Sequence, residues 1–305
     1  MSPPNDDLYA LLPEDLRHAA ILRLIELGLA EDLSAEADPA RFSADITSGD
    51  VTSTATIAAA TRLNGQIKAK AEGVVAGLAV ARVVFAFVSD SIEFYPAVHD
   101  GDRVAPGGLL VEVAGPGRAL LTGERTALNF LGRMSGVASL TRRYAEAVAG
   151  TGATILDTRK TAPGSRRLDK YAVRVGGGSN HRMGLFDMAL IKDNHIDGAG
   201  GLQNAVARVR AMHGDRLPVE VEVKSLDELE TALRLPVDRI MLDNMDLDTM
   251  RRAVELVDGC IPLEASGNMT LARVRAVAET GVDFISVGAL THSAPVLDVS
   301  MRMAV

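Results

Sequence analysis

The sequence predicts an α/β protein in which a C-terminal barrel of parallel strands follows an N-terminal α+β domain. From about residue 153, short apolar runs alternate with helical patterns, and this alternation is typical of parallel strands joined by helices. Residues 92–121 instead contain short strand-like runs separated by turns rich in Gly and Pro. A doubly wound sheet is the alternative for the C-terminal part, but no G-x-G-x-x-G follows a first strand, which favours the barrel.

The N-terminal part mixes helices and strands. Residues 13–33 carry apolar side chains at helical spacing, opposite charged ones, and predict an amphipathic helix. Residues 34–56 are rich in Ser, Ala, Asp and Thr and predict loop or extended structure. Residues 62–71 alternate as a strand does. The apolar run Val74–Val88 is too short and too broken to span a bilayer, so a buried helix is expected.

The C-terminal part repeats a strand and a helix several times. Strands are expected at 153–157, 188–192, 219–223, 239–243, 261–265 and 283–287. Helices are expected between them at 200–212, 226–235, 247–257 and 270–280. Each predicted strand ends at or beside a polar residue or a glycine, namely Asp157, Lys192, Glu222, Asp243, Ser266 and Gly288. Because the carboxyl ends of barrel strands meet at one face, where binding sites lie, these residues are expected to form a site.

Composition narrows the class of protein. The chain has 305 residues, 47% of them hydrophobic, and a formal net charge of −8, so a sizeable core is expected and a broad basic face for nucleic acid is not. The one cysteine, Cys260, excludes an internal disulfide and is expected to be a buried, inert thiol. The acidic N-terminus lacks the basic start and apolar core of a signal peptide. A cytoplasmic protein that binds neither nucleic acid nor membrane is therefore expected.

One segment differs from this acidic composition. Residues 157–192 contain eight Lys or Arg and three Asp, a local balance of 8 − 3 = +5. The arginine fork suits carboxylate and phosphate, and lysine adds a point charge, so the segment can bind a ligand with several negative groups. A solvated basic face with a flexible glycine turn at 176–178 is the alternative. The strand-end pattern favours binding, because it places part of this segment at the expected site.

Acidic residues are expected at the same face. Glu222 and Asp243 end neighbouring strands and suit ribose hydroxyls or Mg²⁺. Strand alternation puts Glu220 on the same side as Glu222, opposite the valines of VEVEV. A structural ion pair with the basic residues is the alternative for these carboxylates.

Glycine turns and histidines complete the expected site. The turns at 266–268 and 288–289 expose backbone N–H groups before helices and predict a phosphate site. His181, beside an arginine, is expected to donate a hydrogen bond to an anionic ligand. The spacing of the histidines gives no metal signature, and His195 and His292 are open to a purely structural role.

Several motifs resemble the quinolinate phosphoribosyltransferase family. The longest is KYAVRVGGGSNHRMGLFDMALIKDNHI, and DTRKTAPG, VEVEV, LDN, LEASGN and FISVGALTHSAPVLDVS also match. ERTALNFLGRMSGVAS at 124–139 and ADITS at 44–48 extend the resemblance, which spans residues 15–303.

The resemblance implies a fold and a reaction. The fold would be an incomplete seven-stranded α/β barrel (TIM-like) at 136–294, with an N-terminal α+β open sandwich domain at 1–135 that residues 295–305 complete. The reaction would transfer phosphoribosyl from phosphoribosyl pyrophosphate to quinolinate with decarboxylation, giving nicotinate mononucleotide, CO₂ and pyrophosphate in NAD biosynthesis. Mg²⁺ would be the cofactor. The protein would be a homodimer or an assembly of dimers, in which the sandwich of one subunit covers the barrel mouth of the other.

The same resemblance assigns a quinolinate-binding group. Arg125 would contact quinolinate in the neighbouring subunit's site. The two carboxylates would be bound within one subunit by Arg159, Lys160, His181 and Arg182, with Thr161 beside them.

The phosphoribosyl pyrophosphate group follows in the same way. Lys192 would lie between quinolinate and the pyrophosphate. Glu222 and Asp243 would hold the ribose hydroxyls and the metal. The 5′-phosphate would be bound by Ser266, Gly267, Asn268, Gly288 and Ala289. The residues expected to act in catalysis are Lys160, Lys192, Glu222 and Asp243.

The sequence departs from the family in three places. Asn268 stands where many members have Gly, Ala162 replaces a Thr that is common after RKT, and residues 34–43 are expected to be an insertion.

Three other functions compete with this one. A relative associated with molybdenum transport shares the RKT motif, but NHR at 180–182 favours the quinolinate enzyme. A non-catalytic anion sensor would not need both Glu222 and Asp243. A metal-dependent aldolase barrel would not explain the basic pairs.

Overall fold

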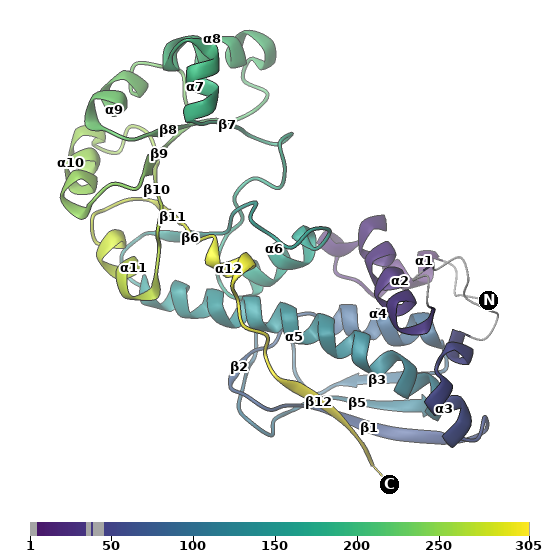
Figure 1. The fold of residues 1–305 in the computed structure, drawn as a ribbon. Helices are drawn as coiled ribbons and strands as arrows, with labels where there is room; N and C mark the ends of the chain where they lie inside the picture. Colours follow the sequence, from purple (N-terminus) through teal and green to yellow (C-terminus); the bar gives the residue numbers. More distant parts are fainter. Residues whose placement is uncertain (1–4, 35–37, 39–45, 305) are drawn as a thin grey trace. The chain divides into compact units, whose positions relative to one another are not determined.

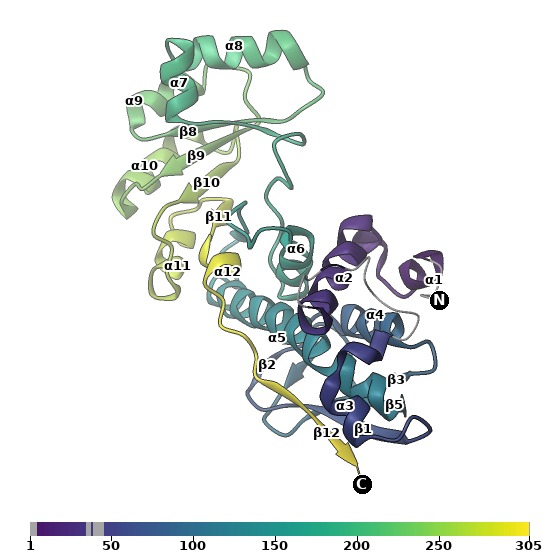
Figure 2. The same cartoon turned by 45° about the vertical axis from the view of Figure 1, so that its right-hand side comes forward.

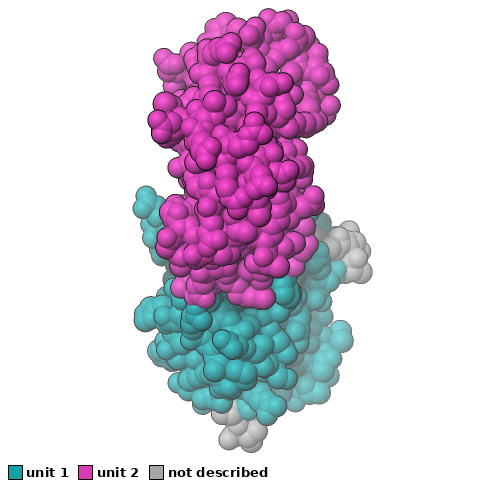
Figure 3. All heavy atoms as spheres, turned by 90° about the vertical axis from the view of Figure 1, so that its left-hand side faces the viewer, with its two compact units in different colours: residues 1–140, 162–176, 294–305 teal, residues 141–161, 177–293 magenta. Residues whose placement is uncertain are grey.

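The computed structural model describes residues 5–34, 38 and 46–304. They belong to two compact units, coloured separately in Figure 3. Unit 1 comprises residues 1–140, 162–176 and 294–305, and unit 2 comprises residues 141–161 and 177–293. The boundary was expected at residue 136, whereas the two units divide after residue 140, and residues 162–176 group with unit 1 rather than with the barrel. The expected insertion at 34–43 and the start of ADITS lie almost wholly outside the described residues.

Unit 1 is built on a four-stranded antiparallel sheet (Figure 1). Its order β12-β1-β5-β3 uses the strands β1 (Arg62–Ala69), β3 (Glu93–Pro96), β5 (Leu109–Pro116) and β12 (Val299–Ala304). Met301 of β12 pairs with Ile67 of β1, so the last residues of the chain complete the N-terminal sheet. A separate pair is formed by β2 (Gly73–Val74) and β4 (Arg103–Val104).

The helices of unit 1 are α1 (Asn5–Ala10), α2 (Ala19–Leu33), α3 (Val51–Thr56), α4 (Leu78–Val88), the first part of α5 (Gly117–Ala147) and α6 (Arg166–Val175). Short 3₁₀ turns lie at Glu14–Leu16 and Ile46–Gly49. Two expectations need correction. The predicted loop at 34–56 contains α3, which Asp50 caps by accepting the Ser53 N–H at 2.8 Å. The predicted helix Val74–Val88 begins only at Leu78, after Gly77 in a left-handed conformation with φ 100°.

The long helix α5 is the largest element that the sequence pattern did not predict. It runs for 31 residues, whereas strands were expected up to residue 121 and no helix after them. Glycines interrupt its apolar pattern, and packing requires two of them. A Cβ on Gly132 would lie 2.9 Å from the Leu297 carbonyl oxygen, and one on Gly136 would lie 2.1 Å from the Pro295 carbonyl oxygen. These glycines therefore let the C-terminal segment run against the helix, at a cost in helix propensity.

Unit 2 contains a parallel sheet in the order β6-β11-β10-β9-β8-β7. Its strands are β6 (Thr154–Leu156), β7 (Ala189–Ile191), β8 (Val219–Val223), β9 (Arg239–Asp243), β10 (Leu263–Ser266) and β11 (Phe284–Ser286). One further parallel bridge joins Leu156 to Ser179. The predicted α/β fold with an incomplete barrel is confirmed, although the described residues form six strands and this bridge where seven strands were expected.

Helices alternate with the strands of unit 2. The four predicted helices are observed as α8 (Leu202–His213), α9 (Leu226–Ala232), α10 (Leu247–Val257) and α11 (Leu271–Ala278). Two short helices, α7 (Asp193–Ala199) and α12 (Ala289–His292), were not predicted. Figures 1 and 2 show α8 to α11 on the outer side of the curved sheet. None of the helices among the described residues is long and apolar enough to cross a membrane.

The inner side of the curved sheet is polar. All five residues of β8 are buried, and its side chains alternate between the two faces of the sheet. Glu220 and Glu222 share the inner side, where Glu220 meets Arg239 of β9. The valines lie on the other side, under the helices. Charged groups are therefore buried inside the barrel, where they need partners.

Cys260 corrects one expectation, because its thiol is exposed rather than buried. The residue follows a turn in which Asp258 and Gly259 adopt positive φ angles of 44° and 73°. Burial begins only at Leu263, where β10 starts. The apolar residues that follow Cys260 in the sequence therefore lead into β10 and do not bury the thiol.

Candidate active site

The end of β6 leads into the loop that carries Arg159 and Lys160. Asp157 is fully buried there, and its carboxylate accepts the His181 N–H at 3.0 Å and the Asn180 side-chain amide at 2.5 Å. The backbone of Lys160 is held as well, because its carbonyl accepts the Thr291 hydroxyl at 2.9 Å. The residues that follow β6 are therefore held by two segments that are distant in the sequence, the loop at 180–181 and the short helix that contains Thr291.

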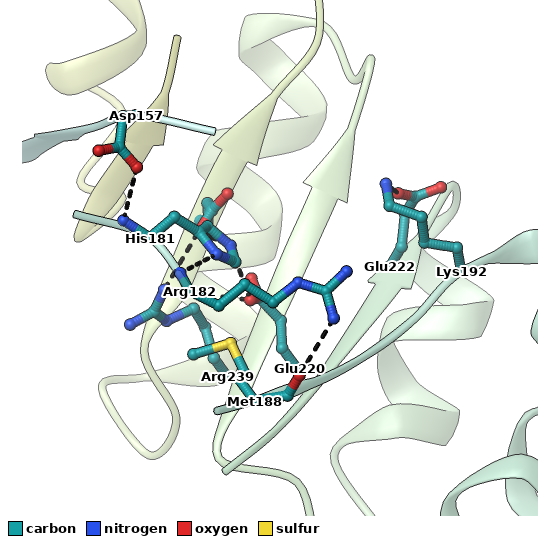
Figure 4. A network of polar contacts seen from close by, with 9 residues as sticks. Asp157, His181, Arg182, Met188, Lys192, Glu220, Glu222 and Arg239 are labelled. Atoms are coloured by element: carbon teal, nitrogen blue, oxygen red, sulfur yellow. Dashed lines mark hydrogen bonds and ion pairs between the residues drawn. The ribbon is translucent and has the colours of Figure 1, made fainter. Parts of the chain in front are cut away.

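A buried cluster of charges surrounds the ring of His181 (Figure 4). Its Nε2 lies 3.1 Å from Glu220 and 3.3 Å from Glu264, and the two glutamates are 1% and 0% exposed. Arg239 Nη1 lies 3.2 Å from Glu264 and 4.0 Å from Glu220. The guanidinium of Arg239 also stacks over Phe284, 4.3 Å from the ring centroid. Two carboxylates, one imidazole and one guanidinium thus compensate one another inside the barrel.

The cluster retains a proton through neutral pH. Burial alone would lower the pKa of His181, but its contacts with the charged Glu220 and Glu264 outweigh burial and raise that pKa to about 9. Burial raises the pKa of Glu220. For Glu264, burial acts in the same direction, but the contact with His181 outweighs it and lowers the pKa. Protons in such a cluster belong to the group rather than to one residue.

The hydrogen bond of Arg182 locates the proton of the His181 ring. The Arg182 backbone N–H donates to His181 Nδ1 at 2.7 Å, which requires a lone pair on that nitrogen. We therefore assign the ring proton to Nε2, which faces the glutamates, and the further proton to the carboxyl pair. The sequence prediction had the imidazole facing an anionic ligand, whereas in the structure Nε2 faces two carboxylates.

Arg182 lies beside this cluster, and its side chain is fixed by the backbone. Its Nη1 donates to the Met188 carbonyl at 3.0 Å. Burial lowers the pKa of Arg182, and the positive charge of Arg159 lowers it further. Two guanidinium groups therefore lie close enough to repel each other, an arrangement that a bound dicarboxylate would stabilise.

Lys192 and Glu222 form an ion pair where β7 and β8 end (Figure 4). Glu222 is buried and Lys192 is half exposed. His195 accepts the Lys192 backbone N–H at 3.0 Å and so caps α7, which supports its structural role. The ring of His292 contacts the Ser293 hydroxyl at 2.6 Å.

The ends of β9 and β10 are joined by a hydrogen-bond chain at the rim. The Asn244 side-chain amide donates to Asp243 at 2.9 Å, and the Asn268 amide donates to Asn244 Oδ1 at 3.3 Å. Asn244, Gly267 and Asn268 all have positive φ angles, of 54°, 100° and 49°. Asparagine tolerates this conformation better than most residues. Asn268 thus has a left-handed backbone conformation, which also suits the glycine that many family members have at this position.

Neighbouring atoms lie so close to Gly267 and Gly288 that a side chain at either position would press against them. A Cβ on Gly267 would lie 2.1 Å from Asn244 Oδ1. A Cβ on Gly288 would lie 3.2 Å from the Lys160 side chain, so the turn before Ala289 lies against the basic loop. The two predicted phosphate turns therefore lie at the carboxyl ends of β10 and β11.

The predicted site residues are divided between the two units. Unit 2 holds all of them except Arg125. Arg125 is exposed on α5 in unit 1, where it lines a cavity of about 250 Å³ with Leu128, Asn129 and residues 296–299.

Four residues of the site were not assigned a role from the sequence. Asp157 was noted only as a strand end, and Glu220 only for its side of the strand. Arg239 and Glu264 were not singled out. Strand alternation carried a signal for Glu264, because it lies two residues before Ser266 and therefore on the same side of β10.

Two family models match this chain. The model of the N-terminal domain of quinolinate phosphoribosyl transferase matches residues 50–135, and the model of its C-terminal domain matches residues 137–302. Quinolinate phosphoribosyltransferase (decarboxylating) 1b of Nicotiana tabacum is 42% identical over 298 residues, covering 92% of this chain and 81% of the relative. A probable nicotinate-nucleotide pyrophosphorylase (carboxylating) of Synechocystis is 46% identical over 238 residues, covering 77% and 81%.

Solved structures give the same result. The nicotinate-nucleotide pyrophosphorylase from Francisella tularensis superimposes with a TM-score of 0.86 at 36% identity, over 99% of this chain and 97% of that one. NadC from Streptococcus pyogenes has a TM-score of 0.86 at 40% identity, over 93% and 96%. The chain therefore belongs to the quinolinate phosphoribosyltransferase family.

Proposed function

We infer that this chain transfers phosphoribosyl from phosphoribosyl pyrophosphate to quinolinate with decarboxylation, giving nicotinate mononucleotide, CO₂ and pyrophosphate in NAD biosynthesis. One observation carries the inference beyond family membership. In unit 2, a pair of mutually repelling arginines lies at the same rim as two carboxylate-bearing strand ends and two glycine turns. Such a rim can hold a dicarboxylate beside a sugar phosphate.

The quinolinate side of the reaction rests on the basic residues. Arg159 and Arg182 bind the two carboxylates, which places the ring nitrogen for attack on the anomeric carbon. The C–N bond forms as the bond to pyrophosphate breaks. Lys160 and Lys192 stabilise the charge that develops on the departing pyrophosphate.

Decarboxylation follows from the product of that step. When the 2-carboxylate leaves as CO₂, its bonding electron pair stays on the ring carbon, where the positive charge of the adjacent pyridinium nitrogen stabilises it, and a proton then adds to that carbon. For this second step, Arg159 and Arg182 need only hold the ring in position.

Mg²⁺ is proposed as the cofactor, held by Glu222 and Asp243. The two carboxylates end neighbouring strands, and both contribute to the raised pKa of Lys224, behind the larger contribution of Asp193. One or two carboxylates plus substrate phosphates are the usual ligands of protein-bound Mg²⁺. When bound, the ion would neutralise charge on the pyrophosphate; Lys192, already paired with Glu222, would orient that carboxylate.

A homodimer, or an assembly of dimers, with shared sites is also proposed, as is a cytoplasmic location. Arg125 would complete the quinolinate pocket of the partner subunit. Its exposure on α5 supports this role, because an exposed arginine is available to a second chain. Fractionation of cells that express the chain tests the location.

The reaction is tested with the purified protein, quinolinate, phosphoribosyl pyrophosphate and Mg²⁺. Nicotinate mononucleotide and CO₂ are expected in equal amounts, and removing Mg²⁺ with a chelator is expected to abolish both until Mg²⁺ is restored. Quinolinate binding without any product at saturating substrate would contradict the enzyme and favour an anion sensor.

The shared site is tested by mixing two strongly impaired variants. Arg125→Ala and Arg182→Ala chains, each with only a small residual activity alone, are expected to recover part of the activity when they are co-assembled. Gel filtration shows whether mixed dimers form, and mixed dimers without any recovery would contradict the sharing of sites.

A further inference from the structure

The buried cluster of Glu220, Glu264 and Arg239 has no role in the reaction as described above. These side chains come from the inner sides of β8, β10 and β9. The two glutamates are 1% and 0% exposed, so solvent does not reach them, whereas the Arg239 side chain is 20% exposed. Figure 4 shows Glu220 and Arg239 beside His181 and Arg182. This placement connects the barrel interior to the basic residues of the site.

Stability alone is a weak reason for such a cluster. Burying two carboxylates costs several kcal/mol, which their partners offset only in part, and apolar side chains of similar volume often stabilise a protein as well or better. The core on the other face of the same three strands is aliphatic, with Val221, Ile240 and Ala265 fully buried. Glu220 and Glu264 therefore invite a functional explanation.

The contacts of the His181 ring give that explanation. Nε2 lies between Glu220 and Glu264, while Nδ1 accepts the Arg182 backbone N–H. One ring therefore joins the glutamates to the backbone of Arg182. The backbone N–H of His181 is held in turn by Asp157. With both ends of this short segment fixed, the direction in which the Arg182 side chain leaves the backbone is fixed too.

We propose that Glu220 and Glu264, supported by Arg239, are positioning residues for the dicarboxylate substrate, and that they act through the His181 ring to orient Arg182. The proposal rests on the function inferred above. Carboxylates that orient a histidine in this way are known to matter when they never touch the ligand, since they fix the ring orientation and the tautomer.

A metal ion is a poorer occupant of this cluster. His181, Glu220 and Glu264 have the donor types and spacing for one. However, the Arg239 guanidinium lies 3.2 Å from the Glu264 oxygen that also faces His181. The two glutamates are also 1% and 0% exposed, so an ion there would have neither water nor substrate phosphate to complete its coordination, unlike an ion at the rim.

The decisive variants are Glu264→Gln and Glu220→Gln, which remove a charge and keep the shape. Glu279→Gln is the matched control, because Glu279 forms an exposed ion pair with Arg275 in the same unit, at 2.6 Å. We expect each cluster variant to raise the KM for quinolinate by about tenfold or more, by analogy with the loss of metal affinity or activity when an orienting partner of a metal-ligating histidine is removed. The KM for phosphoribosyl pyrophosphate is expected to stay within about twofold of the starting value, and the control is expected to change neither.

The outcomes separate the possible roles. A lower melting temperature with both KM values unchanged would mean that the cluster is purely structural, and would overturn the proposal. Equal increases in both KM values would also overturn it. If the unmodified protein makes no product, the inferred reaction fails, but the cluster can still be tested by direct binding of quinolinate to the same variants.

A second measurement needs no variant that might fail to fold. Nitrogen NMR of the unmodified protein with ¹⁵N-labelled histidine reports the protonation of each ring nitrogen. For His181 we expect a proton on Nε2 and none on Nδ1 at neutral pH. A proton on Nδ1 would break the link to Arg182 and contradict the positioning role.

Discussion

The two sides of the candidate site are held in place by different means. On the quinolinate side, defined as Asp157, His181, Arg182, Glu220 and Glu264, buried charges fix the segment that carries the binding residues. On the phosphate side, defined as Asp243, Asn244 and residues 266–268, the residues are at the rim, and left-handed backbone conformations set the turns.

The difference follows from the groups that each side has to present. Guanidinium groups on long side chains need contacts that restrict their rotamers. For Arg182 these are the Met188 carbonyl and the buried residues that hold its backbone through His181. Backbone N–H groups need only the correct turn, which depends on φ and on the lack of a Cβ. The quinolinate side should therefore be sensitive to changes of charge, and the phosphate side to changes of backbone conformation.

The largest effect is expected from removing charge at the quinolinate side. Arg182→Ala is predicted to lower kcat/KM for quinolinate by about 10²-fold, since a preorganised donor to a charged group is lost. Steady-state kinetics with quinolinate varied measures this. A rate near that of the unmodified protein would remove Arg182 from the site.

A smaller but clear effect is expected from a methyl group at the phosphate side. In Gly267→Ala the new Cβ meets Asn244 Oδ1 at 2.1 Å, and φ is 100°, so the turn must move. The KM for phosphoribosyl pyrophosphate should rise by about tenfold. Gly259→Ala is the control: it has a positive φ of 73° but nothing within 4 Å of its Cβ, so only stability should fall, by about 1 kcal/mol. An equal loss of activity in the control would contradict the explanation by contact.

The quinolinate side should also make stability depend on pH. The pKa of about 9 at His181, above the ordinary imidazole value of 6.5, belongs to the proton that the ring shares with Glu220 and Glu264. The stabilisation from this shared proton is therefore fully present below pH 6.5 and is lost as the pH rises through about 9. Between pH 6.5 and pH 9.5 the free energy of unfolding should fall by on the order of 2 kcal/mol more than in His181→Gln.

Urea unfolding at a series of pH values measures that difference. His99→Gln, at an exposed histidine of unit 1, is expected to show the same pH dependence of the free energy of unfolding as the unmodified protein. If His181→Gln shows that same dependence, the cluster does not hold the proton assigned to it.

The smallest effect is expected at Asn268. Glycine adopts its φ of 49° without strain, so Asn268→Gly removes only the 3.3 Å hydrogen bond to Asn244. The KM for phosphoribosyl pyrophosphate should change by no more than about threefold. A loss as large as that of Gly267→Ala would mean that the Asn268 side chain itself binds the substrate.

Much of the barrel could be predicted from the sequence. Strands 219–223 and 239–243 and the helix 247–257 were predicted with the observed bounds, because each is a short, regular pattern with a clear start and end. The strand-end residues were predicted to be at one face because parallel strands share a direction. The long helix α5 was missed, since the glycines that its packing requires resemble helix breakers.

The buried half of the site could not be predicted in the same way. Alternation placed Glu220 on the inner side of its strand, but its partner Glu264 comes from β10, two strands away. Which inner side chains meet depends on the order, register and curvature of the strands. The hydrogen bond from Arg182 to His181 depends on a local loop conformation that carries no periodic signal.

The central claim is that the two sides act on different substrates. The most direct test is to determine both KM values for Arg182→Ala and Gly267→Ala under identical conditions. We predict that Arg182→Ala raises the KM for quinolinate and leaves that for phosphoribosyl pyrophosphate within about twofold, and that Gly267→Ala does the reverse. If each variant raises both KM values to the same extent, the division of the site into two sides is wrong.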